Sequence, residues 1–380
     1  FLMGEEFTPE EIILGVSQGV KDGSICPVFC GDAHNTFAID QFLNSLTWLA
    51  PSAAVKAEEI AVDLDGEPVE ISVNPNAATA AIVFKTVADP FMNPETEAWL
   101  RSMGVENTCK DYHEILNDPE IQAVLICSST NTHSPISLEA IAAGKHVFCE
   151  KPIDHDLGRI KEVVEALKGS NLKYQVGFNR RHDHNFAAVK QAINDGKVGD
   201  VHIIKITSRD PEPPSAEYAA VSGGMFLDMT IHDFDMVRFL AGCDAEEIYV
   251  QSAVLVDPAI GEAGDVDTAV ITLKMENGAI AVIDNSRRAA YGYDQRAEVF
   301  GSKGMVATAN DTLSTAVLSN ADGVTGEKPL YFFLERYMQS FATEVKGFIN
   351  AIENDTDTLV GVEDGLKPVQ RRILHAMKAV

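Results

Sequence analysis

"QAVLICSSTNTHSPISLEAIAAGKHVFCEKP", residues 122–152, is the stretch that decides the fold. Residues 122–129 form a short apolar run that predicts a buried strand, 134–144 predict a helix that ends at a glycine, and 146–152 predict a second strand. The same alternation surrounds this stretch, with predicted helices at 94–104, 112–118 and 158–169 and a predicted strand at 173–179. Strands and helices that alternate at this short spacing are typical of a parallel sheet with crossover helices.

The pattern changes after residue 180. A linking helix at 185–196 is followed by strand-like runs up to residue 309, several of them separated by glycine-containing turns, which predicts an antiparallel sheet. One helix, at 224–241, interrupts these runs, and a last helical stretch at 334–354 is expected to return to the first domain. We therefore predict an α/β plus α+β fold class, with a Rossmann-like parallel sheet domain and a C-terminal domain that carries an open antiparallel sheet.

One part of a dinucleotide-binding domain is absent from the sequence. "KTVADPFMNP", residues 85–94, predicts a strand that runs into a loop with Asp89 at its tip. In dinucleotide-binding folds such a carboxylate binds the adenine ribose, and it follows about 20 residues after a G-x-G-x-x-G turn that holds the pyrophosphate. No such glycine turn precedes Asp89 in this chain.

The bulk composition excludes several classes of function. A chain of 380 residues is long enough for two domains, and its net charge of −27 disfavours partners with phosphate backbones and anionic lipid surfaces. The six cysteines include no C-x-x-C pair, which favours reduced thiols in the cytoplasm over disulfides or a metal site. No apolar run reaches the roughly 18 residues of a membrane span. We expect a cytoplasmic protein that binds neither nucleic acid, membrane nor metal.

The predicted helix at 224–241 is the first candidate for chemistry. Asp228, His232 and Asp235 are spaced i, i+4 and i+7, which places them on one face of a regular helix whose other positions are largely apolar. A carboxylate one turn from a histidine can fix the imidazole tautomer and stabilise its protonated form, which suits a general base. The alternative is a buried Asp-His pair that only satisfies its own hydrogen bonds.

The carboxyl ends of the predicted strands are the second candidate, because open α/β sheets bind ligands at this edge. Glu150 and Lys151 end one strand, where the lysine could hydrogen-bond a substrate hydroxyl, although a surface ion pair is the alternative. The segment that ends the preceding strand offers hydroxyls and a helix N-terminus for a phosphate or a ribose. Its candidate residues are Ser128, Ser129, Thr130 and His133.

Two further groups are weaker candidates. Arg180 and Arg181 follow the strand at 173–179, and a solvated hinge is the alternative to a site there. Tyr291 and Tyr293 could reach a polar substrate, but strand tyrosines more often pack or pair across a sheet.

Three motifs together resemble a known family. "CEKP" at 149–152, "GFNRR" at 177–181 and "GGMFLDMTIHDFD" at 223–235 have the order and spacing of the glucose-fructose oxidoreductase, inositol dehydrogenase and MocA family, and the resemblance runs from about Val87 to about Leu366. It implies an N-terminal Rossmann domain and a C-terminal α+β domain whose open sheet forms a homotetramer. It also implies reversible, NAD-dependent oxidation of a cyclitol or sugar hydroxyl, as in the inositol 2-dehydrogenases.

The resemblance also implies roles for individual residues. His232 resembles the general base, Asp228 the residue that orients it, and Lys151 the residue that binds and polarises the reacting hydroxyl. The implied substrate contacts are Arg181, Tyr291, Asp228 and His232. The implied cofactor contacts are Asp89, Ser128 and Glu150, to which we add the neighbouring Ser129, Thr130, His133 and Lys151.

Both ends of the chain resemble other families. Residues 1–91 resemble the end of the GTPase domain of bacterial elongation factor G, but the G-x-x-x-x-G-K-[ST] loop is absent, so translation activity is not implied. Residues 364–377 resemble an early segment of the DNA gyrase and topoisomerase IV A subunit. We infer a chimera, in which 1–76 replace the first Rossmann unit. The remaining expected parts are 77–176 (rest of the cofactor domain), 177–333 (substrate and oligomerisation domain) and 334–380 (returning helices).

The missing glycine turn bears directly on activity. Without backbone N–H groups that approach the pyrophosphate closely, NAD affinity is expected to fall by several kcal/mol, about tenfold for each 1.4 kcal/mol. We therefore expect an inositol 2-dehydrogenase-like oxidoreductase whose NAD binding is weak or lost. The alternatives are a non-enzymatic assembly that keeps the oligomerising sheet and a sugar pocket and, with less support, a translation-factor fragment.

Overall fold

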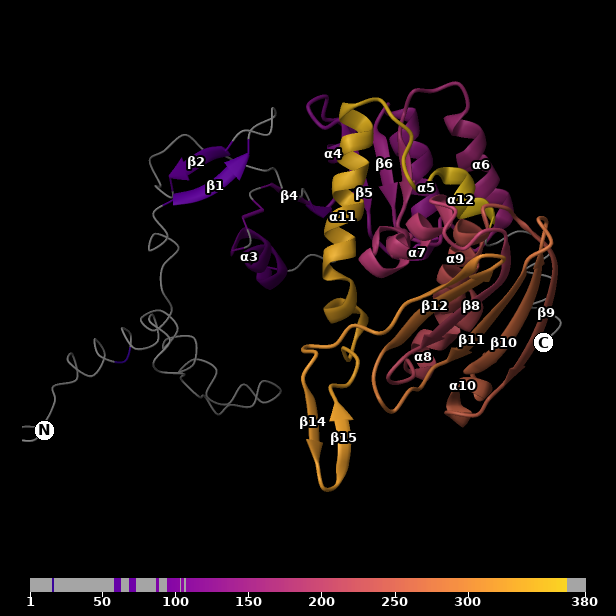
Figure 1. Ribbon diagram of the computed structural model, residues 1–380. Coiled ribbons are helices and arrows are strands. Elements are labelled where there is room, and N and C mark those ends of the chain that lie inside the picture. Colours follow the sequence, from indigo (N-terminus) through magenta and orange to yellow (C-terminus); the bar gives the residue numbers. More distant parts are fainter. Residues whose placement is uncertain are drawn as a thin grey trace, which may run out of the picture. The chain divides into compact units, whose positions relative to one another are not determined.

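A computed structural model describes residues 107–367 without a break, together with positions 16, 58–62, 68–72, 87–88, 94–102, 104 and 105. The chain forms two compact units, and the antiparallel hairpin β1–β2 belongs to the first, whereas all elements from β4 onward belong to the second (Figure 1). Asp89 lies outside the described residues, as does most of the gyrase-like segment. Of the elongation-factor-like segment, only position 16, β1, β2 and residues 87–88 are described. The elements before β5 are β1 (Glu58–Val62), β2 (Pro68–Ser72), β3 (Val87–Ala88), α3 (Pro94–Ser102), β4 (Thr108–Cys109) and α4 (His113–Asn117).

The parallel sheet that 122–152 predicts is present. Strands β5 (Ala123–Ile126), β6 (His146–Cys149) and β7 (Tyr174–Val176) pair in parallel in that order, and β3 pairs in parallel with β4. Crossover helices α5 (Thr130–Ala142) and α6 (Leu157–Leu167) connect the three strands. Helix α5 begins four residues before the predicted start, because Thr132 closes its first turn with both its amide and its hydroxyl on the Ser129 carbonyl.

The second sheet has six strands in the order β13-β12-β8-β11-β10-β9. The prediction of an antiparallel sheet holds for four of the five strand pairs, but β11 pairs with β8 in parallel, so the sheet is mixed. Between β8 and β11 the chain forms three α-helices, one π-turn and two strands, and this long connection makes the parallel pairing possible. The six strands are β8 (Val201–Arg209), β9 (Ala245–Ala253), β10 (Thr268–Met275), β11 (Ile280–Ser286), β12 (Asp294–Gly301) and β13 (Gly304–Ala307).

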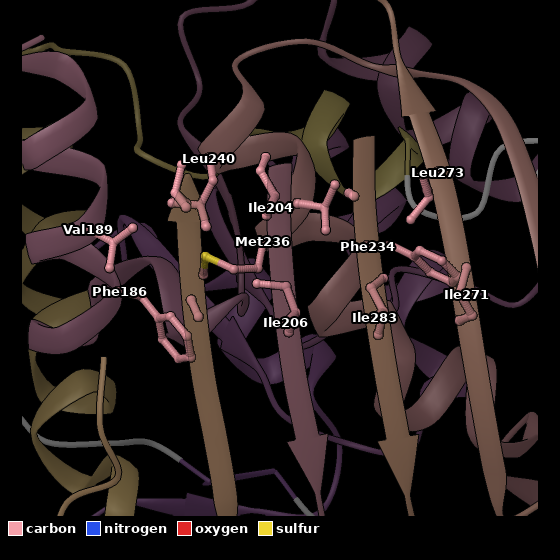
Figure 2. Packing of buried hydrophobic residues seen from close by; sticks show 14 of the residues in the cluster. Phe186, Val189, Ile204, Ile206, Phe234, Met236, Leu240, Ile271, Leu273 and Ile283 are labelled. Atoms are coloured by element: carbon pink, nitrogen blue, oxygen red, sulfur yellow. The ribbon is translucent and has the colours of Figure 1, made fainter. Parts of the chain in front are cut away.

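Helices cover one face of this sheet. Alternate residues of the strands, such as Ile204, Ile206 and Ile283, are fully buried against Phe234 and Met236 of the helix α9 (Figure 2). This period-two burial is what an amphipathic strand requires when one face meets helices and the other does not. The helices of this domain are α7 (His184–Asn194), α8 (Ala216–Val221), α9 (Ile231–Ala241) and α10 (Pro258–Glu262).

The chain ends with a hairpin and two helices. The hairpin β14 (Val317–Asn320) and β15 (Gly323–Gly326) is exposed along its whole length. It leads to α11 (Phe333–Glu353), which lies alongside the parallel sheet in Figure 1, and then to α12 (Val362–Leu366). The Phe348 ring of α11 packs edge-on against Phe148 of β6, with 6.1 Å between the ring centroids. Among the described helices none is both long and apolar enough to cross a bilayer.

Candidate active site

Lys151 lies two residues after the end of β6, and its side chain reaches Asp228 on the segment before α9. Its Nζ donates to the Asp228 backbone carbonyl oxygen at 2.6 Å and lies 3.5 Å from the Asp228 carboxylate. Glu150, one residue earlier, is largely buried, and Gly177 of the next strand end allows its close approach, because a methyl group at Gly177 would lie 2.7 Å from Glu150 Oε2. The sequence therefore places an acid and a lysine at the edge where parallel sheets bind ligands.

Asp228 does not face His232 in the way that a regular helix predicts. Phe226–Thr230 form a turn of π-helix, η3, before α9 begins at Ile231. A π-turn takes more residues than an α-turn, so the i, i+4 spacing no longer stacks the two side chains on one face. The Asp228 carboxylate contacts Lys151, Arg287 and Tyr218 instead, and the expected orienting contact with His232 is not formed.

Arg287 connects Asp228 to a second acid. Its guanidinium donates to Asp228 Oδ2 and to Asp210 Oδ2, both at 3.1 Å, and Tyr218 of α8 donates to Asp228 Oδ1 at 3.1 Å. Burial would raise the pKa of Asp228, but the positive charges of Lys151 and Arg287 outweigh it and hold that pKa below its usual value. The site therefore contains an ionised carboxylate between two cations.

The sequence reasoning missed Asp210, Arg287 and Tyr218. Asp210 and Arg287 follow the last residues of β8 and β11, and these two strands pair in parallel with Ser286 opposite Arg209. The sequence marks both strand ends, but it does not say that the two strands are neighbours. Tyr218 carries no sequence signal of its own, since it lies on a six-residue helix.

The surroundings of His232 keep its imidazole ring uncharged. Its Nδ1 is buried without a hydrogen-bond partner, and its ring meets the Phe178 ring edge-on with 5.9 Å between centroids. Burial, and then the charges of Lys151 and Arg180, lower the pKa of His232 well below its ordinary value. An imidazole that is unprotonated at neutral pH can accept a proton.

A buried polar network lies next to His232 and fixes the π-turn. Arg180 pairs with Asp233, and Asn285 of β11 donates to the same carboxylate at 2.8 Å. Thr230, the last residue of the π-turn, donates to Asn285 Oδ1 at 2.7 Å. Because each buried polar group here has a partner in the network, the turn that carries Asp228 is tied to the sheet.

Arg181, expected at the substrate, is held by protein groups. It makes two hydrogen bonds to the Asp235 carboxylate, at 2.8 and 2.6 Å, and further ones to Asp364 and to the Leu359 carbonyl. Only 6% of Arg181 is exposed. This geometry favours a structural role for Arg181, which links α9 to the chain around α12. Asp235 then has the same structural role, as the buried partner of Arg181.

The other expected contacts differ in their surroundings. Ser128 and Ser129 are exposed after β5, and Thr130 begins α5, so their polar groups are accessible at the ligand-binding edge. His133 is buried, with Nδ1 2.8 Å from the Pro152 carbonyl oxygen and Nε2 2.9 Å from that of Ser128, so both ring nitrogens are engaged by the protein. The Tyr291 hydroxyl donates to Asp294 at 2.6 Å and accepts from Arg209.

Both sheet domains match known families. Residues 77–178 match the oxidoreductase family with an NAD-binding Rossmann fold, and residues 186–307 match the GFO/IDH/MocA C-terminal domain. The myo-inositol 2-dehydrogenase of Thermotoga maritima is 51% identical over 263 residues, which are 69% of this chain and 79% of that protein. The chain belongs to the GFO/IDH/MocA oxidoreductase family. An inositol 2-dehydrogenase of Rhizobium meliloti is 45% identical and covers 74% of this chain and 84% of its own.

Solved structures support the GFO/IDH/MocA fold. A probable dehydrogenase from Thermotoga maritima superposes with a TM-score of 0.75 and 45% identity over 78% of this chain and 90% of that one. The scyllo-inositol dehydrogenase of Lactobacillus casei, solved with NAD(H) and scyllo-inositol, has a TM-score of 0.70 and 32% identity over 76% of this chain and 87% of that one. The predicted fold class, a Rossmann-like sheet with a second sheet domain, is confirmed.

The described residues of this GFO/IDH/MocA protein contain no group of three or more His, Cys, Asp or Glu side chains arranged to hold a metal ion. The polar groups that converge are Lys151, Asp228, Arg287, Asp210 and Tyr218, with His232 on the turn that follows Asp228. One tyrosine hydroxyl, two carboxylates and two cations suit a ligand that offers several hydroxyl groups.

Proposed function

We propose that this protein is an NAD-dependent oxidoreductase of the inositol 2-dehydrogenase type that oxidises one hydroxyl of a cyclitol or sugar to a ketone. The observation that carries the proposal is the contact of Lys151, at the carboxyl end of a Rossmann strand, with Asp228, beside the neutral base His232. The relatives named inositol 2-dehydrogenase and the similar structure with bound NAD(H) and scyllo-inositol support it.

Three residues have separate roles in the removal of the proton from the reacting hydroxyl. Lys151 donates a hydrogen bond to the reacting hydroxyl and stabilises the negative charge that develops on its oxygen. His232 accepts the hydroxyl proton, because its lowered pKa keeps the imidazole neutral. Asp228, fixed by Arg287, holds Lys151 in place through its carbonyl oxygen and its carboxylate.

NAD, when bound, supplies the acceptor for the hydride that leaves the same carbon. Ser128, Ser129 and Thr130 would face it, since the exposed Ser128 and Ser129, the half-buried Thr130 and the start of α5 suit ribose oxygens. Asp89 remains a proposed ribose contact from its sequence position alone. His133 would act indirectly, because its ring nitrogens are engaged by two carbonyls that hold the ends of β5 and β6.

We propose that NAD binding is weak because residues 1–76 replace the first Rossmann unit. The sequence has no G-x-G-x-x-G turn before Asp89, and the family match begins at residue 77. Isothermal titration of the full chain with NAD is the test, with His232→Ala as a variant that leaves cofactor contacts unchanged. Dissociation constants in the millimolar range are expected for both proteins, and micromolar binding would refute the impaired site.

Activity is tested separately. NADH formation at 340 nm with myo-inositol at saturating NAD should be measurable for the full chain and lost in His232→Ala. Inositol binding without turnover at any NAD concentration would instead favour the non-enzymatic sugar-binding alternative. NADH formation that is indifferent to His232→Ala would contradict the assignment of the base.

We also propose a homo-oligomer in a reducing, cytoplasmic compartment. Met305, Phe300, Ile203 and Ile280 lie in one row across four adjacent strands on the sheet face that no helix covers, and each is 45–58% exposed. A continuous apolar row of this kind marks a protein interface. Cys109, Cys149 and Cys243 are free thiols, which supports the compartment.

A further inference from the structure

A buried acid on α11 has no role in the mechanism above. Glu344 is 1% exposed and lies one turn after Ser340 and one turn before Phe348. Ser340 accepts a hydrogen bond from Asn179 at 3.2 Å, and Phe348 packs on Phe148. Glu344 therefore lies between two contacts with the carboxyl ends of β6 and β7, on the side of the Rossmann sheet that carries Glu150 and Lys151.

The hydrogen bonds around Glu344 lack one donor. Gln175 of β7 is fully buried and donates through Nε2 to the Glu344 backbone carbonyl at 2.8 Å. Its Oε1 and the carboxyl Oε2 of Glu344 are both buried without a partner. If Glu344 were ionised, both unpaired atoms would be acceptors, whereas one proton on Glu344 supplies the missing O–H donor.

The charges that face Glu344 lead to the same conclusion. Glu150 faces it from the end of β6, and Lys151 is the cation beside Glu150. His182 of η2 (Asn179–His182) packs on α11 at Gly347 and is neutral, since burial and then Arg181 lower its pKa to about 4.

The nearby arginines are committed to other acids. They form the buried pairs Arg180–Asp233, Arg181–Asp235 and, from α11 itself, Arg336–Asp183. Within the described residues Glu344 thus has no cationic partner. Burial, and then Glu150, raise the pKa of Glu344 to about 9.

We propose that Glu344 is a positioning residue for the proposed reaction. As a neutral carboxylic acid it donates a hydrogen bond to Gln175, and it leaves Glu150 as the single negative charge next to Lys151. The inference rests on the proposed function only in naming Lys151 as the active-site lysine. Ionisation of Glu344 adds a carboxylate that has no cation of its own and that repels Glu150, which displaces the turn and releases Lys151 from the Asp228 carbonyl.

The position of Lys151 can be measured without cofactor or substrate. Reductive methylation with isotopic formaldehyde, followed by peptide mass spectrometry, gives the labelling rate of Lys151 relative to the exposed Lys161. The full chain is labelled at about pH 7.5 and about pH 10. The variants are Glu344→Gln, which stays neutral and keeps an N–H donor, and Glu344→Met, which is neutral and has none. Glu353→Gln, an exposed site on the same helix, is the matched control.

In the wild type and in Glu353→Gln the relative labelling of Lys151 should rise at least about tenfold, since a group with a pKa of about 9 goes from a few per cent to about nine tenths ionised over this range. Glu344→Gln should change less than about twofold, and Glu344→Met should already label fast at the lower pH because its donor is missing. Parallel rises in wild type and Glu344→Gln, or slow labelling of Glu344→Met, would overturn the proposal. Absent NAD binding in the wild type would instead count against the proposed function, and the labelling would still decide on Glu344.

Discussion

The replacement Glu344→Gln should stabilise the protein, and the gain should depend on pH. Glu344 has a pKa of about 9 in the fold, against an ordinary value of 4.5, because burial and the neighbouring Glu150 disfavour its ionised form. A carboxyl group whose pKa is raised by folding contributes most stability below its unfolded pKa and loses that contribution as the pH rises towards its folded pKa. Glutamine cannot ionise in either state, so the variant avoids this loss.

The size of the effect follows from the two pKa values. Over the range between them, the free energy of unfolding of the wild type falls by about 1.4 kcal/mol per pH unit relative to the variant. From pH 4.5 to pH 7 this amounts to about 3 kcal/mol in favour of Glu344→Gln. Near pH 4.5 the two proteins should have nearly equal stability, because the acid is then protonated in the fold and only half ionised in the unfolded chain.

Urea unfolding followed by circular dichroism at several pH values between 4.5 and 8.5 measures this difference. The expected result is a gap between Glu344→Gln and wild type that widens with pH at unchanged m-value. Glu353→Gln, which makes the same chemical change at an exposed position of α11, should stay within about 0.5 kcal/mol of wild type throughout. A gap of constant size, or a variant less stable than wild type at pH 7, would show that Glu344 is ionised in the fold.

Three further predictions concern the base, the core and the open sheet face. His232→Ala should reduce kcat about 10²- to 10⁴-fold, since it removes the base. Lys151→Gln should move the acid limb of the pH profile of kcat/KM to higher pH. After burial, the charge of Lys151 is the main cause that lowers the pKa of His232, so its removal raises that pKa. A limb that stays in place would contradict this coupling. Phe234→Ala should lower the free energy of unfolding by about 3–5 kcal/mol in urea titrations, since this fully packed ring leaves a cavity against the sheet. Phe300→Asp should give a smaller species in analytical ultracentrifugation with an unchanged far-UV spectrum, and an unchanged mass would refute the interface.

Local sequence patterns predicted the helices and strands better than they predicted which strands pair with each other. The alternation in 122–152 gave three elements that the structure contains, with bounds that differ by a few residues at most strand ends and by four at the start of α5. The parallel pairing of β8 with β11 could not be predicted, because both strands show the same period-two pattern and either sheet order would bury it. Pairing depends on contacts between residues about 80 positions apart, which the local pattern does not encode.

The candidate site shows the same limit at the level of single side chains. Lys151 was predicted from its place at a strand end, and the structure brings it to Asp228. The contact between Asp228 and His232 was predicted from helical spacing, and one π-turn removes it. Thr230, the last residue of that turn, donates to Asn285 of β11, and this is a tertiary contact. Sequence spacing assumes a regular helix, and sites often depart from that assumption.

The balance of charge at the site favours a neutral substrate. Asp210, Asp228 and Glu150 share two cations, since Arg287 bridges the first two and Lys151 lies beside the last two. An anionic sugar acid or phosphate would add charge to a group of described residues that already holds more carboxyl groups than cations, whereas a polyol adds only hydroxyls that can donate to carboxylates and accept from lysine and arginine. Burial, and then the negative charge of Glu150 in this group, favour the neutral form of Glu344. The excess of carboxyl groups that disfavours an anionic ligand thus also contributes, after burial, to the raised pKa of Glu344.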